Sequence, residues 1–211
     1  MFQVQGSGFQ VQGSGFSAAI LIGGRATRFE GRDKSALIVE GKTILSRQLE
    51  ALQGVVSDVM SVGGDRVPSS EIRHVADIVP GCGPLSGLHA ALSSARFPMT
   101  LVLACDMPFV SAPLLRHLLS LAGGENGPDI VVPQTERGYH PLCAVYSRAC
   151  LEPAARRLAS GDFRLAALFD DVRVRVVTAD ALAAFGDPDR LLANVNTSTE
   201  YRAIEANGMQ S

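Results

Sequence analysis

A glycine-bearing loop with several cationic side chains is the part of this sequence whose residue types most directly suggest chemistry. It reads LIGGRATRFEGRDK from Leu21 to Lys34. Glycines let backbone N–H groups converge on phosphate oxygens, and Arg25, Arg28 and Lys34 supply charge that can neutralise a triphosphate. The spacing fits neither a Walker A loop nor the GxGxxG turn of dinucleotide-binding folds. A solvated surface turn is the alternative, but the position directly after an apolar run favours phosphate binding, with Arg28 and Lys34 as candidate catalytic cations.

Asp106 is the candidate metal ligand. It lies in LVLACDMP, residues 101–108, immediately beyond an apolar run and next to a proline-bounded turn. The next predicted helix begins about six residues later, too far away for Asp106 to cap it. Mg²⁺ prefers oxygen ligands and commonly bridges a carboxylate to substrate phosphates. We therefore expect Asp106 to bind Mg²⁺.

Further polar segments lie between predicted elements. They are Asp77 after an apolar pair, PGCGPLSG (80–87), RGYHP (137–141) and NVNT (194–197). PGCGPLSG offers rigid turns and exposed backbone donors at a helix start. Loops often carry binding residues, but each of these segments by itself is also typical of an ordinary turn.

Alternating strands and helices are predicted around these segments. Short apolar runs indicate strands, and apolar residues at helical spacing indicate helices. In the first half, strands are predicted at 17–22, 55–62, 100–104 and 130–132, and helices at 42–52, 84–95 and 112–121. In the second half we expect an added strand at 141–146, a helix at 149–158, a strand at 172–177 and a closing helix at 199–206.

This alternation predicts an α/β fold: a single Rossmann-like, three-layer domain with a mostly parallel sheet covered by helices on both faces. Ligands of such folds bind beyond the carboxyl ends of the strands, so we expect the site just after Ile22 and Ala104. The domain is expected to span residues 16–211. Residues 1–15, in which FQVQGSG occurs twice, are expected to form a flexible extension because of their Gly-Ser composition.

The composition excludes several other classes of protein. With 19 basic and 21 acidic side chains, the net charge of −2 gives no overall positive field for nucleic acid or an anionic membrane. No run approaches the roughly 20 apolar residues of a membrane span, and no secretory signal is visible, so we expect a cytoplasmic protein. The four cysteines have neither a CxxC pair nor zinc-site spacing and are expected to be small buried hydrophobes.

Taken together, the polar segments resemble the molybdenum cofactor guanylyltransferase family. LIGGRATRFEGRDK looks like its LAGG...R...DK loop, and PGCGPLSG, ACDMP, GYHP and NVNT look like its PGPLAG, CDxP, HP and NVNT segments. The segments occur in the family's order over about residues 16–201. The resemblance implies a nucleotidyltransferase-type fold.

The resemblance also implies roles for individual residues. Those implied to bind GTP are Leu21, Ile22, Gly23, Gly24, Lys34, Ser61, Asp77 and Asp106. Asp106 would hold Mg²⁺ at the α-phosphate. The molybdopterin side would be shaped by His140, Asn194 and Asn196.

The sequence departs from the family pattern at a few of these positions. Ile22 replaces a small alanine, which would narrow the base pocket. Ser61 stands where some members have an asparagine, so a hydrogen bond to the nucleotide would be shortened or replaced by water. Glu30 stands where glycine is common, and its charge would have to point away from a triphosphate.

The implied reaction is attack by the terminal phosphate of molybdopterin on the α-phosphorus of GTP, with release of pyrophosphate. An ionised phosphate needs no protein nucleophile, so catalysis would depend on in-line positioning and charge stabilisation. The alternatives are a cytidylyltransferase of the same cofactor, another small-molecule nucleotidyltransferase, and a non-catalytic nucleotide-binding regulator. GTP and molybdopterin are the expected partners, and the resemblance leaves room for proteins that supply or receive the molybdenum cofactor.

Overall fold

The computed structural model describes residues 15–22, 28–29, 32–64, 69, 72–77, 82–124 and 126–195 of the 211-residue chain, with only the backbone described at 28–29 and 32–34. The predicted N-terminal extension falls almost entirely outside these ranges, as does the predicted closing helix at 199–206. In the part that the structure describes, no helix is both long enough and apolar enough to cross a membrane.

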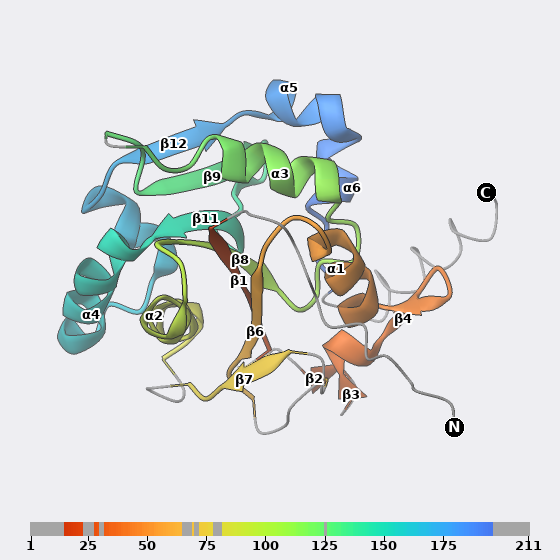
Figure 1. The fold of residues 1–211 in the computed structure, drawn as a ribbon, viewed down its shortest axis with the longest axis horizontal. Helices are drawn as coiled ribbons and strands as arrows, with labels where there is room; N and C mark the ends of the chain where they lie inside the picture. The colour runs from red at the N-terminus through yellow and green to blue at the C-terminus, as the bar shows by residue number, and fades with distance from the viewer. Residues whose placement is uncertain are drawn as a thin grey trace, which may run out of the picture.

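The centre of the molecule is an 8-stranded sheet with the order β10-β9-β11-β8-β1-β6-β7, in which β12 also pairs with β9 (Figure 1). Its strands are β1 (Phe16–Leu21), β6 (Asp58–Val62), β7 (Arg73–Val75), β8 (Met99–Ala104), β9 (Ile130–Thr135), β10 (Gly138–Tyr139), β11 (Cys143–Ser147) and β12 (Val174–Val177). Strands β7, β6, β1 and β8 are parallel neighbours, whereas β11 runs antiparallel to both β8 and β9. Two short pairs lie outside this sheet: β2 (Arg28–Phe29) with β3 (Arg32–Asp33), and β4 (Ile38–Val39) with β5 (Lys42–Thr43).

Helices cover both faces of the sheet. The α-helices are α1 (Ile44–Leu52), α2 (Pro84–Ser94), α3 (Ala112–Ser120), α4 (Leu151–Ser160), α5 (Ala179–Leu182) and α6 (Pro188–Leu191). Short 3-10 turns are η2 (Lys34–Ala36), η3 (Arg148–Cys150), η4 (Leu165–Asp170) and η5 (Ala183–Phe185). In Figure 1, α2 and α4 lie together on the left of the sheet, and α1 lies on the right.

The core has two layers because successive strand residues point to opposite faces. Ala18 and Ile20 of β1 pack into a cluster with α1 and α3, which we call the α1–α3 cluster. Ala19 and Leu21 pack into a cluster with α2 and α4, the α2–α4 cluster. Strand β8 alternates in the same way, and all of its residues are buried. The structure therefore confirms the predicted three-layer α/β fold with a mostly parallel sheet.

Several predicted boundaries change in the structure for local reasons. The helix predicted at 42–52 begins at Ile44, since Thr43 is its N-cap and accepts a hydrogen bond from the Ser46 N–H at 3.1 Å. The strand predicted at 55–62 begins at Asp58. The added strand at 141–146 is β11, and it runs antiparallel because the short link from β9 cannot carry the chain back for a parallel crossover.

A buried ion-pair network joins the amino-terminal ends of β1, β6 and β7. The Asp58 carboxylate, whose side chain is only 2% exposed, accepts hydrogen bonds from Arg73 Nε and Nη2 at 3.1 and 3.0 Å. Ser17 Oγ also donates to it at 2.7 Å. Arg73 Nη2 donates in addition to the Ser94 carbonyl at 2.7 Å, which ties the end of α2 to the same network. This network lies at the opposite end of the strands from the predicted site.

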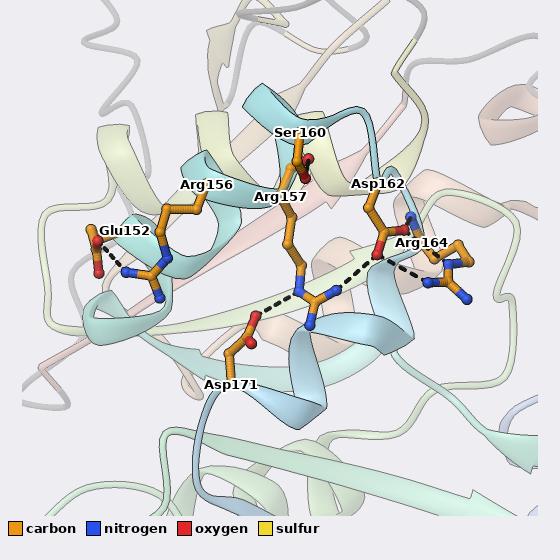
Figure 2. A network of polar contacts seen from close by, with 7 residues as sticks. All are labelled: Glu152, Arg156, Arg157, Ser160, Asp162, Arg164 and Asp171. Atoms are coloured by element: carbon orange, nitrogen blue, oxygen red, sulfur yellow. Dashed lines mark hydrogen bonds and ion pairs between the residues drawn. The ribbon is translucent and has the colours of Figure 1, made fainter.

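A more exposed polar network connects α4 to η4 (Figure 2). Arg157 donates from Nε to Asp171 at 2.5 Å and from Nη1 to Asp162 at 2.8 Å. Arg164 donates to the same Asp162 carboxylate at 2.9 and 3.0 Å. Gly161 ends α4 with φ of 77°, a left-handed conformation that glycine adopts without strain. The network fixes the turn by which the chain leaves α4.

Candidate nucleotide-binding site

The carboxyl ends of β1, β6 and β8 meet at one edge of the sheet, where the sequence predicts the site. The Cys105 N–H donates to the Leu21 carbonyl at 3.2 Å, and the Ile22 N–H donates to the Val62 carbonyl at 2.9 Å. From β1 the chain goes to β6 on one side of the sheet and only later returns to β8 on the other side. Such a change of direction is where open α/β sheets bind ligands.

Asp106 lies in the loop after β8, at this switch point. Its carbonyl oxygen accepts a hydrogen bond from the Val195 N–H at 2.9 Å, which holds the described part of NVNT against the loop. Asn194, the residue before Val195, is exposed. A small apolar cluster supports this contact, and we call it the Phe109 cluster: Leu37, Val39, Ile44, Phe109 and Val195. The structure thus brings Asp106 and Asn194 together from distant parts of the chain.

Asp77 follows β7 and contacts the start of α2. Its carboxylate accepts a hydrogen bond from the hydroxyl of Ser86, a fully buried residue in the first turn of that helix. A carboxylate near a helix N-terminus is favoured by the helix dipole. The helix also approaches β1 closely, because a Cβ at Gly87 would lie 3.3 Å from Leu21 Cδ1. The described part of the PGCGPLSG segment, residues 82–87, therefore reaches the end of β1 through Gly87.

Ser61 is placed at the same edge, but its side chain is fully buried. Its hydroxyl lies 3.1 Å from His74 Nδ1 on the neighbouring strand. Leu21 and Ile22 are also nearly buried, with 7% and 6% of their surfaces exposed. Contact between Ser61 and GTP stays a prediction, and Ser61 is the least accessible of these residues.

His140 reaches this edge because β11 is antiparallel to β8. The loop that leads into β11 lies beside the carboxyl end of β8, and the Ala104 N–H donates to the Leu142 carbonyl at 2.8 Å. His140 Nε2 lies 2.9 Å from Thr135 Oγ1. Burial lowers the pKa of His140 below its ordinary value, so its imidazole is neutral near pH 7. It can orient a ligand by hydrogen bonding, and burial disfavours a positive charge on it.

Comparison with known protein families identifies the family to which the chain belongs. The family model described as the MobA-like NTP transferase domain matches residues 18–176 of this chain. The chain belongs to the MobA-like NTP transferase family. As a MobA-like NTP transferase it is a nucleotidyltransferase.

Comparison with individual proteins supports this family assignment. The molybdenum cofactor guanylyltransferase of Desulfosudis oleivorans is 34% identical over 190 residues, which cover 89% of this chain and 93% of that protein. The structure is similar to molybdopterin-guanine dinucleotide biosynthesis protein A from Archaeoglobus fulgidus, with a TM-score of 0.77 at 25% identity over 92% of this chain and 100% of that one. A cytidylyltransferase from Thermus thermophilus, that for 2-C-methyl-D-erythritol 4-phosphate, shares the fold with a TM-score of 0.63 at 18% identity, covering 92% of this chain and 98% of that one. The MobA-like fold by itself therefore does not fix the base of the nucleotide.

Part of the predicted site lies outside the described residues. This applies to Gly23, Gly24 and Asn196. Arg28 is placed in β2 and Lys34 at the start of η2, with only their backbones described. The roles of these residues stay predictions.

The donor set near Asp106 fits a hard divalent cation that is shared with substrate phosphates. Within the described ranges, no three His, Cys, Asp or Glu side chains gather into a metal-binding cluster. Asp106 instead offers a carboxylate beyond the end of β8, on a loop whose backbone is held by other elements. Mg²⁺ commonly takes one or two carboxylates and completes its shell with phosphate oxygens and water. Asp106 suits that mode of binding.

Sequence reasoning missed two residues that touch the Asp106 loop, Arg47 and Gln48 of α1. Gln48 is fully buried and donates from Nε2 to the carbonyls of Ala104 and Met107, at 2.7 and 3.1 Å. A signal was present in the sequence, since Gln48 falls on the apolar face of a predicted helix, where a polar side chain requires buried partners. The partners could not be named from the sequence because they lie more than fifty residues away.

Proposed function

We propose that this MobA-like NTP transferase is a Mg²⁺-dependent molybdenum cofactor guanylyltransferase, which transfers GMP from GTP to molybdopterin and releases pyrophosphate. The observation that carries the proposal is the convergence of three family segments at one sheet edge. Leu21 ends β1 and Ile22 follows it, Asp106 follows β8, and Asn194 is held beside Asp106 through the Val195–Asp106 hydrogen bond. The 34% identical relative carries a guanylyltransferase name.

Each group of residues at this sheet edge would have a role in the reaction. Leu21, Ile22 and the following glycines would enclose the base, and Lys34 and Arg28 would neutralise the phosphates. Asp106 would hold Mg²⁺, which supplies charge at the α-phosphate and the leaving pyrophosphate when bound. The acceptor phosphate is ionised at neutral pH, so the protein's task is to align it for in-line attack.

The acceptor side would be formed by the loop into β11 and the segment after α6. His140 is held by Thr135, and burial lowers the pKa of its imidazole, which favours hydrogen bonding to a polar pterin over charge pairing. Asn194 is exposed next to the Asp106 loop, and Asn196 follows it. Asp77 would remain on the nucleotide side, near the N-terminus of α2.

Nucleotide choice is the first test of this function. Guanine and cytosine present different hydrogen-bonding edges, and a buried site shaped for one leaves polar groups unpaired with the other. We expect GTP to be preferred over CTP and ATP by roughly 10² or more in kcat/KM. The measurement is pyrophosphate release with each nucleotide at equal concentration, with molybdopterin present and Mg²⁺ fixed.

The possible outcomes separate the competing functions. Equal rates with GTP and CTP would contradict the guanylyl assignment but leave nucleotidyl transfer intact, and Ile22→Ala would then show whether this side chain sets the ratio. Binding of GTP without pyrophosphate release in the presence of molybdopterin would point to a non-catalytic regulator.

The role of Asp106 is tested by Asp106→Asn, which keeps the shape of the side chain and removes its charge. We expect turnover to fall on the order of 10²-fold or more, as for loss of one preorganised electrostatic group. The control is Asp180→Asn, the same change at an exposed position on α5. Wild-type turnover of Asp106→Asn at ordinary Mg²⁺ would remove Asp106 from the mechanism.

A further inference from the structure

The backbone of the loop that carries Asp106 is held by side chains of α1. Gln48 Nε2 donates to the carbonyls of Ala104 and Met107, which lie on either side of Asp106. Arg47, the residue before Gln48 in α1, donates from Nε to the carbonyl of Pro108, the residue after Met107, at 2.9 Å. Two adjacent residues of α1 therefore hold the backbone of the loop both before and after Asp106.

Gln48 contributes to this arrangement at a cost in stability. It is fully buried, and its Oε1 atom has no hydrogen-bond partner among the described residues. Its orientation is unambiguous because both neighbours of Nε2 are carbonyl oxygens, which accept and cannot donate. A buried amide oxygen without a partner is unfavourable. Such a local conflict is expected where a side chain serves the geometry of a site rather than the stability of the core.

Arg47 is itself held in place by a second set of contacts. Its Nη2 atom pairs with Glu40 at 3.0 Å, and Nη1 donates to the Val39 carbonyl at 3.3 Å. Glu40 also accepts from Arg190 Nη2 at 2.6 Å, and the two guanidinium groups both lie against the ring of Phe109, at 5.6 and 4.3 Å from its centroid. The β4–β5 turn, α1 and α6 thus converge on the same loop.

We propose that Gln48 and Arg47 are positioning residues for Asp106, which set the place of its carboxylate for the divalent cation and the nucleotide phosphates. The inference rests on the proposed function, because it assigns these residues to the metal-binding step through Asp106. Neighbours that orient a metal ligand typically change metal affinity or activity 10–100-fold when they are replaced. The side chains of Gln48 and Arg47 need not touch the substrate to have such an effect.

The test uses Gln48→Met and Arg47→Met in the full-length protein. Methionine keeps the length of the Gln48 side chain and the apolar stem of Arg47, and it removes the donors of both. We expect each variant to need roughly tenfold more Mg²⁺ for half-maximal pyrophosphate release and to show a lower kcat, with little change in the KM for GTP at saturating Mg²⁺. Arg47→Lys keeps a donor and a positive charge and should recover part of the loss.

The matched control is Arg148→Met. Arg148 also donates from its side chain to loop carbonyls, those of Ala95 at 2.6 Å and Phe97 at 3.5 Å, but at the opposite end of β8. This variant should keep the wild-type Mg²⁺ dependence. An equal shift in Arg148→Met would show that the effect is general loosening of the fold, and would overturn the inference.

A binding measurement provides a readout independent of turnover. Calorimetric titration with the non-reactive analogue α,β-methylene-GTP, at a series of Mg²⁺ concentrations, should show weaker Mg²⁺-dependent binding for Gln48→Met. The melting temperature is measured alongside, and a folded Arg47→Met variant keeps the test decisive if Gln48→Met does not fold.

Asp106→Asn, assayed in parallel, distinguishes the two proposals. If Asp106→Asn loses turnover while Gln48→Met and Arg47→Met retain wild-type Mg²⁺ dependence, the positioning inference fails and the proposed function stands. If Asp106→Asn itself behaves like the wild type, both fail.

Discussion

Asp58 is a residue whose ionisation is coupled to folding. Burial by itself raises the pKa of its carboxyl, but hydrogen bonds from Arg73 and Ser17 outweigh this, and the pKa lies below the ordinary value. A group whose pKa is depressed on folding stabilises the protein above its unfolded pKa, near 3.9. That contribution is lost as the pH falls through the lower, folded value. Asp58 therefore contributes at neutral pH and stops contributing under strongly acidic conditions.

Asp58→Asn tests this coupling. We expect the variant to lose about 2 kcal/mol of unfolding free energy at pH 7, because the buried Arg73 pair loses its charge. The difference from the wild type should begin to shrink below about pH 4, where Asp58 of the unfolded chain becomes protonated, and should disappear as the pH falls through the lower pKa of the folded protein. Urea unfolding at several pH values measures both effects. Glu152→Gln, which breaks an exposed pair with Arg156, is the control and should change stability little at any pH.

At the scale of elements, the period of the apolar pattern predicts β1, β8, α2 and α3 to within one or two residues. Those elements are fully or half buried, so the spacing of their apolar residues shows whether each is a strand or a helix. Strand β7 is missed because Arg73 and His74 make it look like a polar loop, although Arg73 serves the Asp58 network.

The candidate site was predictable only in part, because the sequence pattern does not show which distant segments are in contact. Residues that follow strands, such as Ile22 and Asp106, could be placed at one edge because the carboxyl ends of parallel strands share that edge. His140 could be placed there only through the direction of β11. Gln48 was hidden, since a helical pattern shows which face is buried but not which loop that face contacts.

Helix α1 offers a prediction at this scale. Its N-cap hydrogen bond, from the Ser46 N–H to Thr43 Oγ1, satisfies one of the free donors in the first turn. Thr43→Ala should reduce the unfolding free energy by about 1 kcal/mol, whereas Thr43→Ser should keep most of the bond and the stability. Denaturant unfolding of the two variants and the wild type measures the difference. Equal loss in both variants would indicate that the threonine methyl, not the cap, is responsible.

At the scale of the whole molecule, we propose that the nucleotidyltransferase domain spans residues 16–211 and that residues 1–15 are an extension outside it. Deletion of Phe2 to Gly15 should leave the melting temperature and turnover almost unchanged, because repeats of Gln, Gly and Ser bury little apolar surface. Strand β1 begins only at Phe16. Differential scanning calorimetry and the pyrophosphate assay check this together. A drop of several degrees would show that the repeat packs on the domain.

The hydrogen bond from Val195 to the Asp106 carbonyl has a consequence for synthesis of the chain on the ribosome. All strands of the main sheet have been made once Val177 has emerged, and both helical layers then have most of their apolar contacts. The Phe109 cluster is still missing Val195, and the Asp106 loop still lacks its bond from that residue. A nascent chain can thus be folded before its nucleotide edge is complete. We therefore expect the growing polypeptide to acquire competence for catalysis late, after the main sheet has formed.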